Sequence, residues 1–459
     1  MGAGLAEYER LCTLVQEVNA CELPGCTIKY GPFNNSMWRA VERGFVTHDN
    51  ATFCAGILRY GATCGIQVDQ LRGQRIFRNY SSAIDARAPV MAEINKRVSA
   101  GKTLQLGAWG TAAVQQLRAY FADFIVFPLG AVAKYMDGVL LPTKRLIDDH
   151  TRTGLNDSTD MTGLWHSLHA DAAVAWYLKQ GYVLRVSDVD SAYPLLPLYP
   201  GVWPFFMFAF WESDAATVQS LFMHVCGDFG TRGMPGTFKV FFDVLQQMAR
   251  SDMVLTLPMA VHVDDCALVG PCKEQTDSEM EQFQAWSGDT CGVYFKAAKD
   301  KLAAQQNLYI GFVWDSITLT RTLEENKLAS YIELLRDYAG RTTLSLSELQ
   351  SIAGKVHRAV KTLPPGASCL MANMFAMTHG LKLPWHRRRT TAALRQDFTT
   401  VADFLELNMG RGYYSYSLFD TAPEVLSDAS KSKNYTGGGY VSADGRYSYW
   451  RYLCCAQTH

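Results

Sequence analysis

Two stretches of the chain place carboxylates beside apolar runs, and both predict strands that end in acidic turns. Residues 261–270 read as strand, turn and strand, with Asp264 and Asp265 between apolar triplets. Residues 183–193 read as an apolar strand ending at Asp188, 76 residues before Asp264. Aspartates are common in turns because their side chains accept hydrogen bonds from local backbone donors. If the two stretches meet, however, they form an anionic pocket for two divalent cations, as phosphoryl transfer requires.

The alternation of apolar and polar residues predicts two further hairpins. Residues 130–149 alternate across an Asp-Gly pair, which is typical of a tight hairpin turn. This hairpin carries three cations: Lys134, Lys144 and Arg145. Such charges are frequent on exposed edge strands, but beside a metal site they would suit the binding of a triphosphate. Residues 308–320 predict the second hairpin, turning at Asp315 and Ser316.

Apolar residues at helical spacing predict helices through the middle and end of the chain. They are expected at about residues 89–98, 164–180, 238–248, 274–286, 323 onward, 345–363 and 390–409. Ser345 and Glu348 have the spacing of a capping box at the start of one helix, and Pro364 with Pro365 should end it. The first 75 or so residues indicate one short amphipathic helix followed by loops and strands, with no recognisable chemistry.

Composition limits the class of protein without naming one. Hydrophobic residues make up 48% and charged residues 19% of 459 residues, which is typical of a globular protein with two to four domains. The net charge of −1 means that any nucleic-acid-binding surface must be local. The densest basic run, residues 386–389, is typical of a solvated face, but on a helical domain beside a nucleic-acid site it would contact phosphates.

The cysteines and the apolar segments indicate where the protein works. Twelve cysteines are scattered without any C-x-x-C pair, which argues against a disulfide framework or a zinc ribbon and suits a reducing compartment. The N-terminus lacks the apolar region of a secretory signal. Prolines interrupt the most apolar run, residues 195–211, so it should not span a membrane. We therefore expect a soluble intracellular protein, cytoplasmic or nuclear, with no membrane partner.

Five motifs, in order along the chain, resemble those of a retroelement reverse transcriptase. Residues 188–193 resemble the first catalytic motif, D-x-x-x-A-[YF], and residues 262–265 resemble the [YF]-x-D-D box. Residues 229–238 resemble the template-contacting loop, and residues 308–312 the primer-grip hairpin. Residues 144–157 are similar to the fingers motif R-x-I-x-D…N-D. Five motifs in the expected order are far more specific than any one of them.

The resemblance extends from about residue 76 to the end and implies an architecture. Residues 349–355 resemble a thumb helix of the retroelements that include the DIRS type. The fold class implied is α+β, a right-hand fingers-palm-thumb polymerase with a partial RNase H-like segment at the C-terminus. The implied divisions are an N-terminal extension of unknown role (1–75), fingers and palm (76–320), a helical thumb or connection (321–415) and a truncated RNase H-like segment (416–459).

The resemblance also implies a role for each matched residue. The catalytic carboxylates would be Asp188, Asp264 and Asp265, which with the Val189 carbonyl would hold two Mg²⁺ ions, or Mn²⁺ in their place. Arg145, with Lys134 or Lys144, would bind the triphosphate. Template and nucleotide contacts would include Phe229, Gly230 and Pro235, and the primer grip Leu308, Gly311 and Phe312.

Tyr193 matches the steric gate under the sugar of the incoming nucleotide. A ring at that place clashes with a 2′-hydroxyl, whereas an RNA polymerase needs a polar group that binds it. Tyr193 therefore favours DNA synthesis over RNA-dependent RNA synthesis. The implied function is an RNA-directed DNA polymerase of a retroelement, with an RNA template, a DNA or RNA primer and dNTPs as partners.

Two departures from the family pattern keep an alternative open. His262 stands where Tyr or Phe is usual, which should alter efficiency without abolishing it. Asp428 and the glycines after it resemble the opening strands of an RNase H domain, yet 31 residues follow Asp428 and none is Glu. We therefore expect Asp428 to be vestigial and RNase H activity to be absent. The alternative is a catalytically weak or inactive retroelement-derived protein that binds nucleic acid.

Overall fold

The computed structural model describes most of the chain. It leaves out residues 137–138, 165–169, 214, 364–366, 415–424, 432–434, 443–446 and 454–459, and it describes the strands after residue 415 by their backbone alone. The chain divides into two compact units, Met1–Gly412 and Tyr413–His459.

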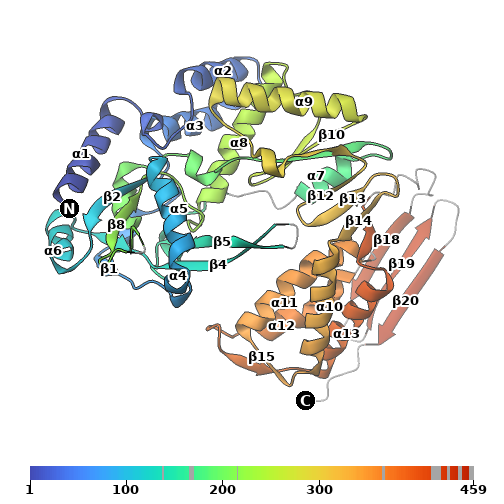
Figure 1. The fold of residues 1–459 in the computed structure, drawn as a ribbon. Coiled ribbons are helices and arrows are strands. Elements are labelled where there is room, and N and C mark those ends of the chain that lie inside the picture. The colour runs from blue at the N-terminus through green and yellow to red at the C-terminus, as the bar shows by residue number, and fades with distance from the viewer. Residues whose placement is uncertain are drawn as a thin grey trace. The chain divides into compact units, whose positions relative to one another are not determined.

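Three helices form the N-terminal part of the first unit: the first confirms the predicted amphipathic helix, and the other two replace the predicted loops and strands. They are α1 (Gly2–Glu17), α2 (Tyr30–Glu42) and α3 (His48–Tyr60), and α2 and α3 pack on the long helix α8, Met234–Ser251 (Figure 1). The buried residue Phe33 of α2 stacks on Phe241 of α8, with ring centroids 5.2 Å apart. The buried residues of α3 include two small ones, Ala51 and Cys54, ahead of Ile57 and Leu58, so the first half of this helix gives only a weak apolar stripe.

A buried five-stranded sheet lies beside these helices. Its order is β1 (Gln74–Ile76), β3 (Phe124–Val126), β7 (Met207–Phe210), β8 (Ser220–His224) and β2 (Thr103–Ala108). The helices next to it in the chain are α4 (Ser81–Asp85), α5 (Arg87–Ser99) and α6 (Thr111–Tyr120). Strands β3, β7 and β8 are buried along their whole length, as expected for runs of aromatic and β-branched residues.

The predicted basic hairpin is confirmed and is called the basic ribbon below. It consists of β4 (Leu129–Met136) and β5 (Val139–Asp148), joined by the residues of the Asp-Gly pair, which lie outside the described residues. Val132 pairs with Arg145 and Ala133 with Lys144 before a bulge shifts the register. Asp148 ends β5 and is buried, so this end of the ribbon is anchored in the core.

An antiparallel sheet of four strands, called the acidic sheet below, carries the carboxylates. Its order is β11 (Lys301–Ala304), β6 (Val183–Asp188), β10 (Asp265–Gly270) and β9 (Met259–His262). Helix α9 (Lys273–Trp286) packs on it, and Arg185 of β6 is buried there with ion pairs to Asp277 and Asp300. Helix α7 (Ala170–Tyr177) is shorter than predicted over its described residues, since 165–169 are outside them.

The hairpin predicted at residues 308–320 is one part of a longer meander. Strands β12 (Gln306–Tyr309), β13 (Phe312–Asp315) and β14 (Thr320–Leu323) are followed in the sheet order by β17 (Arg411–Tyr413). Asp315 caps the predicted turn by accepting from the backbone of Ile317 and Thr318. The turn missed by the sequence lies at Ile310 and Gly311, which have φ of 43° and 73°.

Helices follow this sheet, as the sequence predicted. The predicted ones are α10 (Glu325–Gly340), α11 (Leu346–Ala359) and α13 (Ala392–Leu407), and the capping box of Ser345 and Glu348 begins α11. The short helix α12 (Ala372–Thr378) was not predicted. The basic run lies partly on a strand, because β16 (Arg387–Arg389) pairs with β15 (Thr343–Ser345). No helix among the described residues combines the length and apolar character needed to cross a bilayer.

The second unit contains an antiparallel three-stranded sheet. Its strands are β18 (Val425–Lys431), β19 (Tyr435–Ser442) and β20 (Tyr447–Leu453), with β19 in the middle. Asp428 of β18 lies opposite Gly439 of β19. The return to β-structure that the sequence predicted is therefore confirmed for the backbone.

The packing of α2 on α8 predicts that the N-terminal helices stabilise the first unit. Phe33→Ala should lower the free energy of unfolding by about 3–5 kcal/mol, because it empties a fully buried ring site. Phe53→Ala, on the partly exposed side of α3, is the matched control and should cost about 1 kcal/mol or less. Urea unfolding followed by circular dichroism measures both; equal costs would show that α2 is peripheral to the fold.

Candidate functional site

The register of the acidic sheet brings the three predicted catalytic carboxylates together. Asp188 ends β6 and Asp265 begins β10, and the two are direct partners in the antiparallel pair. Directly paired residues point to the same face of a sheet. Asp264 precedes Asp265 in the turn, and one oxygen of each carboxylate lies within 4.8 Å of the other two.

The turn that carries Asp264 is held in a strained conformation by its neighbours. Val263 has φ of 58°, a value that costs a β-branched residue of the order of 1–3 kcal/mol. The backbone N–H of Val189 donates to the Asp264 carbonyl at 3.0 Å. The hydroxyl of the buried Tyr309 donates to the Asp265 carbonyl at 3.1 Å. The surrounding strands therefore fix both carboxylates through the backbone.

Crowding of the carboxylates changes their protonation. Burial, followed by the charges of Asp264 and Asp188, raises the pKa of Asp265 to about 7. Burial and Asp188 also raise the pKa of Asp264, against the opposing effect of nearby lysines. Like charges held this close cannot all ionise without a compensating cation.

Two lysines that the sequence analysis overlooked bind Asp188. The Lys296 ammonium donates to Oδ1 of Asp188 at 2.6 Å and to the Val189 carbonyl at 3.2 Å, and Lys299 donates to Oδ2 of Asp188 at 2.5 Å. Burial alone would lower the pKa of Lys299, but Asp188 and its neighbours raise it. The sequence does contain a signal for this pair, the Lys-x-x-Lys spacing of Lys296 and Lys299. Residues three apart lie on the same side of a 3₁₀ turn, and such a turn is present at Ala297–Lys299.

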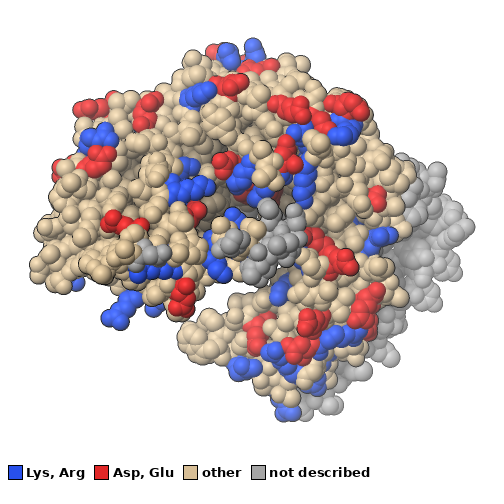
Figure 2. Space-filling view, in the orientation of Figure 1, with Lys and Arg blue, Asp and Glu red and all other residues tan. Residues whose placement is uncertain are grey.

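The donor set fits divalent cations of the Mg²⁺ type. Carboxylate and carbonyl oxygens are the ligands that Mg²⁺ and Mn²⁺ prefer. Asp188, Asp264 and Asp265 supply such oxygens, and the Val189 carbonyl lies at the same end of β6. Three carboxylates share this pocket with two lysines, Lys296 and Lys299, so ionisation of all three would leave negative charge that the lysines do not offset. On the face shown in Figure 2, Lys and Arg side chains gather beside Asp and Glu around a hollow.

Tyr193 lies within the electrostatic reach of the carboxylates. It is largely buried, and burial followed by Asp264 raises the pKa of its hydroxyl. Its ring centroid is 4.8 Å from that of Phe229 and 6.0 Å from that of Phe238. Phe229 itself is 54% exposed, so its ring forms an open surface next to the predicted gate.

The Phe229 loop, residues 228–233, is shorter than the sequence predicted. Helix α8 begins at Met234, four residues before the predicted start, with Pro235 in its first turn. Proline is tolerated there because its missing N–H would have no helical partner. Gly230 is required by close approach, since a Cβ at that position would lie 1.9 Å from the Asp148 carbonyl oxygen.

The cations of the basic ribbon cannot all face one ligand. Lys144 and Arg145 are neighbours on β5, and successive side chains of a strand point to opposite faces. Lys144 shares its face with the buried residues Leu146 and Asp148, whereas Arg145 is exposed. Lys134 is exposed within the bulge of β4. The triphosphate role of these three residues stays a prediction.

The predicted primer-grip residues lie on the meander and against helix α11. Leu308 is on β12 and Phe312 on β13, with Gly311 in the turn between them. Phe312 is buried, and the Arg358 guanidinium of α11 stands 5.1 Å from its ring centroid. A side chain at position 311 would meet Arg358, so this turn is closely packed.

Comparisons with known proteins support the fold. No family model and no curated protein sequence matches the chain. The solved foamy viral protease-reverse transcriptase dRH with double-stranded DNA matches at TM-score 0.54 and 14% identity, over 83% of this chain and 58% of that one. The foamy viral protease-reverse transcriptase with an RNA/DNA hybrid matches at TM-score 0.52 and 13% identity, over 83% of this chain and 44% of that one. The foamy viral protease-reverse transcriptase with double-stranded DNA matches at TM-score 0.54 and 12% identity, over 91% of this chain and 80% of that one.

The chain has a reverse-transcriptase-like fold. The α+β class predicted from the sequence is therefore confirmed. The chain spans about three fifths of the length of the first of these proteins and less than half of the length of the second. Membership of the DIRS group and the RNase H identity of the second unit stay predictions.

The raised pKa of Asp265 predicts how stability depends on pH. A carboxyl whose folded-state pKa is raised stabilises the protein below about pH 4, and that contribution is lost as the pH rises through about 7. Asp265→Asn should therefore match the parent at about pH 4 but exceed its unfolding free energy at pH 8 by about 1–3 kcal/mol. Urea unfolding in EDTA at both pH values measures this, with the exposed Asp69→Asn as control. A variant no more stable than the parent at pH 8 would contradict the crowding.

Proposed function

We propose that this chain is an RNA-directed DNA polymerase, a nucleotidyltransferase that extends a primer 3′-hydroxyl with dNTPs. The observation that supports it most is the close set of Asp188, Asp264 and Asp265 at the end of paired strands in a reverse-transcriptase-like fold. The proposed partners are an RNA template, a DNA or RNA primer and dNTPs. A retroelement source, of the DIRS type or another, rests on the sequence motifs alone.

The three carboxylates and the Val189 carbonyl would hold two Mg²⁺ or Mn²⁺ ions. When bound, such ions stabilise the attacking and leaving oxygens of an in-line displacement. The protein contributes the placement: strand register holds Asp188 beside Asp265, and the Val263 turn presents Asp264. Lys296 and Lys299 orient the Asp188 carboxylate by binding one oxygen each.

Other parts of the chain would position the substrates. Tyr193 would exclude the 2′-hydroxyl, and the exposed ring of Phe229 beside it would contact the template or the base. The basic ribbon would bind the triphosphate, with Arg145, Lys134 or Lys144 as its cation. The meander with Leu308, Gly311 and Phe312 would hold the primer end.

The division of the chain into polymerase domains is also proposed. Residues 76–320 would be fingers and palm, 321–415 the thumb and 416–459 a truncated RNase H-like segment, with residues 1–75 as an N-terminal extension. The antiparallel order β18-β19-β20 supports the last of these for the backbone. Asp428 would be vestigial.

One observation favours the alternative of a nucleic-acid-binding protein without catalysis. Both oxygens of Asp188 accept hydrogen bonds from lysines, which would compete with a cation for the same atoms. Primer extension on an RNA template with dNTPs and Mg²⁺ or Mn²⁺ decides between the two functions. Template binding without extension in either metal would favour the alternative.

Asp264→Asn should abolish extension while leaving the fold and duplex binding nearly unchanged. A neutral amide of the same shape is a poor ligand for Mg²⁺, and removing one of three repelling carboxylates does not destabilise the protein. We expect a loss of at least about a hundredfold in extension rate. The matched control is Asp190→Asn, because Asp190 lies in the same acidic stretch but is exposed. Activity of Asp264→Asn within about tenfold of the parent would contradict its role as a metal ligand.

Tyr193→Ala should admit ribonucleotides and reduce discrimination against them by about two orders of magnitude, since the barrier is a steric clash. Tyr193→Phe keeps the ring and should discriminate like the parent. Competition between dNTP and rNTP in one extension assay measures both variants. Unchanged selectivity in Tyr193→Ala would mean that another residue is the gate.

A further inference from the structure

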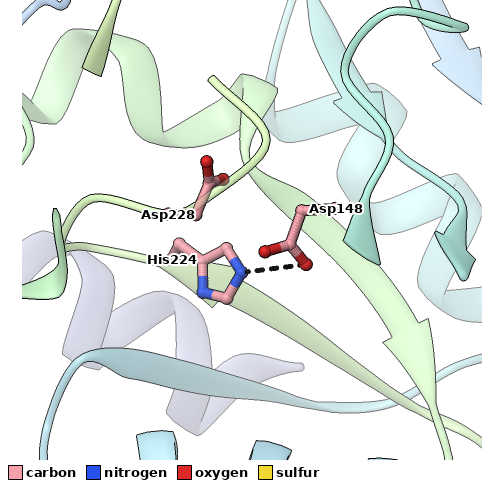
Figure 3. A group of neighbouring side chains, drawn as sticks. All are labelled: Asp148, His224 and Asp228. Carbon is pink, nitrogen blue, oxygen red and sulfur yellow. Dashed lines mark ion pairs between the residues drawn. The ribbon is translucent and has the colours of Figure 1, made fainter. Parts of the chain in front are cut away.

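A second group of charged residues lies buried behind the Phe229 loop. The buried residues Asp148, His224 and Asp228 place one ligand atom each within 4.8 Å of one another (Figure 3). Two more buried residues, Arg97 and His150, contact the same group through Asp148 and Asp228. The polymerase motifs assign no task to His150, His224 or Asp228.

This group is balanced by its own charges and is not built as a cation site. Arg97 Nη1 lies 3.2 Å from Asp148, a fixed cation beside the carboxylate that a metal would need. His224 faces Asp148, while the carboxylate of Asp228 points away from that pair (Figure 3). It accepts instead from Nε2 of His150 at 2.6 Å. The group therefore serves to hold its own members in place.

Asp228 connects this pair to the Phe229 loop. Its second oxygen, Oδ1, accepts from the backbone N–H groups of Gly230 and Thr231 at 3.0 Å each and from the Thr231 hydroxyl at 2.8 Å. These bonds span Phe229 on both sides in sequence. The backbone conformation at Phe229 is therefore set by the carboxylate that His150 holds.

The segment that follows the basic ribbon binds the same loop at further points. Asn156 donates to the Gly230 carbonyl at 3.1 Å and accepts from the Arg232 N–H at 2.9 Å. Gly230 is in close contact with the Asp148 carbonyl, so the loop has little room to shift on that side. Among these attachments, the His150–Asp228 pair is the buried ionic one.

The Phe229 ring has few other restraints. It is 54% exposed, and its aromatic neighbour is Tyr193, with ring centroids 4.8 Å apart. Because one side of this ring faces solvent, its position depends mainly on the conformation of the backbone at Phe229. A displaced backbone at Phe229 would remove one of the two aromatic neighbours of Tyr193, leaving Phe238.

We propose that His150 and Asp228 are positioning residues, whose buried ion pair fixes Phe229 against Tyr193 and so sets the discrimination between deoxynucleotides and ribonucleotides. The inference rests on the proposed polymerase function. The charges agree with it: burial would lower the pKa of His150, but Asp228, then Asp148 and Asp149, raise it. Burial alone would raise the pKa of Asp228, but His150 lowers it.

Two substitutions at His150 separate positioning from mere loss of packing. The amide nitrogen of Gln can lie near the place of Nε2, whereas that of Asn reaches only as far as Nδ1, so His150→Gln keeps the donor to Asp228 and His150→Asn loses it. His150→Asn should reduce the preference for dNTP over rNTP at least about tenfold, through a lower KM for rNTP. His150→Gln should stay within about threefold of the parent.

The same pair of variants tests the path through Phe229. Phe229→Ala should lower discrimination in the same way, and His150→Asn should add little to it, because residues in one path do not act additively. A purely structural role for His150 would instead slow dNTP and rNTP incorporation equally in both His150 variants and leave their ratio unchanged. That result would overturn the inference.

A measurement that needs no activity keeps the inference separate from the proposed function. Amide hydrogen exchange in the full chain should be at least about tenfold faster at Gly230 and Thr231 in His150→Asn, and unchanged in His150→Gln. If the parent does not extend a primer, the proposed function fails, while exchange still shows whether His150 holds the loop. Equal exchange in both variants would overturn the positioning role whatever the activity.

Discussion

The repulsion among Asp188, Asp264 and Asp265 is the constraint on which the site depends. Strand register places Asp265 directly opposite Asp188, and the turn adds Asp264. Holding three carboxylates this close costs electrostatic free energy when they are ionised. Burial strengthens that repulsion, because a lower dielectric weakens screening. Burial first, and then the charges of Asp264 and Asp188, raise the pKa of Asp265 to about 7.

The rest of the fold supplies the rigidity that such a site needs. Tyr309 of the meander donates to the backbone of Asp265, and Val189 of the neighbouring strand to that of Asp264. Val263 keeps a left-handed conformation that a valine would leave if the turn were free. Carboxylates that repel one another stay together only if their backbones cannot move apart, and three strands provide that restraint.

The sequence predicted the parts of this arrangement that depend on local pattern. The strands ending at Asp188 and starting at Asp265, the basic hairpin and the capping box of Ser345 leave periodic or positional signals. Helices α2 and α3 were missed because their large buried residues alternate with small ones such as Ser36, Ala40 and Ala51, which weakens the apolar periodicity. Lys296, Lys299 and the His150–Asp228 pair were missed for another reason: each bond joins residues from 78 to 111 positions apart, and a single sequence carries no record of such pairing.

The two acidic groups described here differ in how the charge of their buried carboxylates is compensated. Asp148 and Asp228 are fully buried, and each faces a fixed cation, Arg97 or His150, so their pKa values are lowered. Burial and then the neighbouring carboxylates raise the pKa values of Asp264 and Asp265, and the two nearby lysines, which both bind Asp188, do not reverse this. A balanced group has nothing to gain from a mobile cation, whereas an unbalanced one does. The same residue type thus forms a scaffold in one place and the proposed ion-binding pocket in the other.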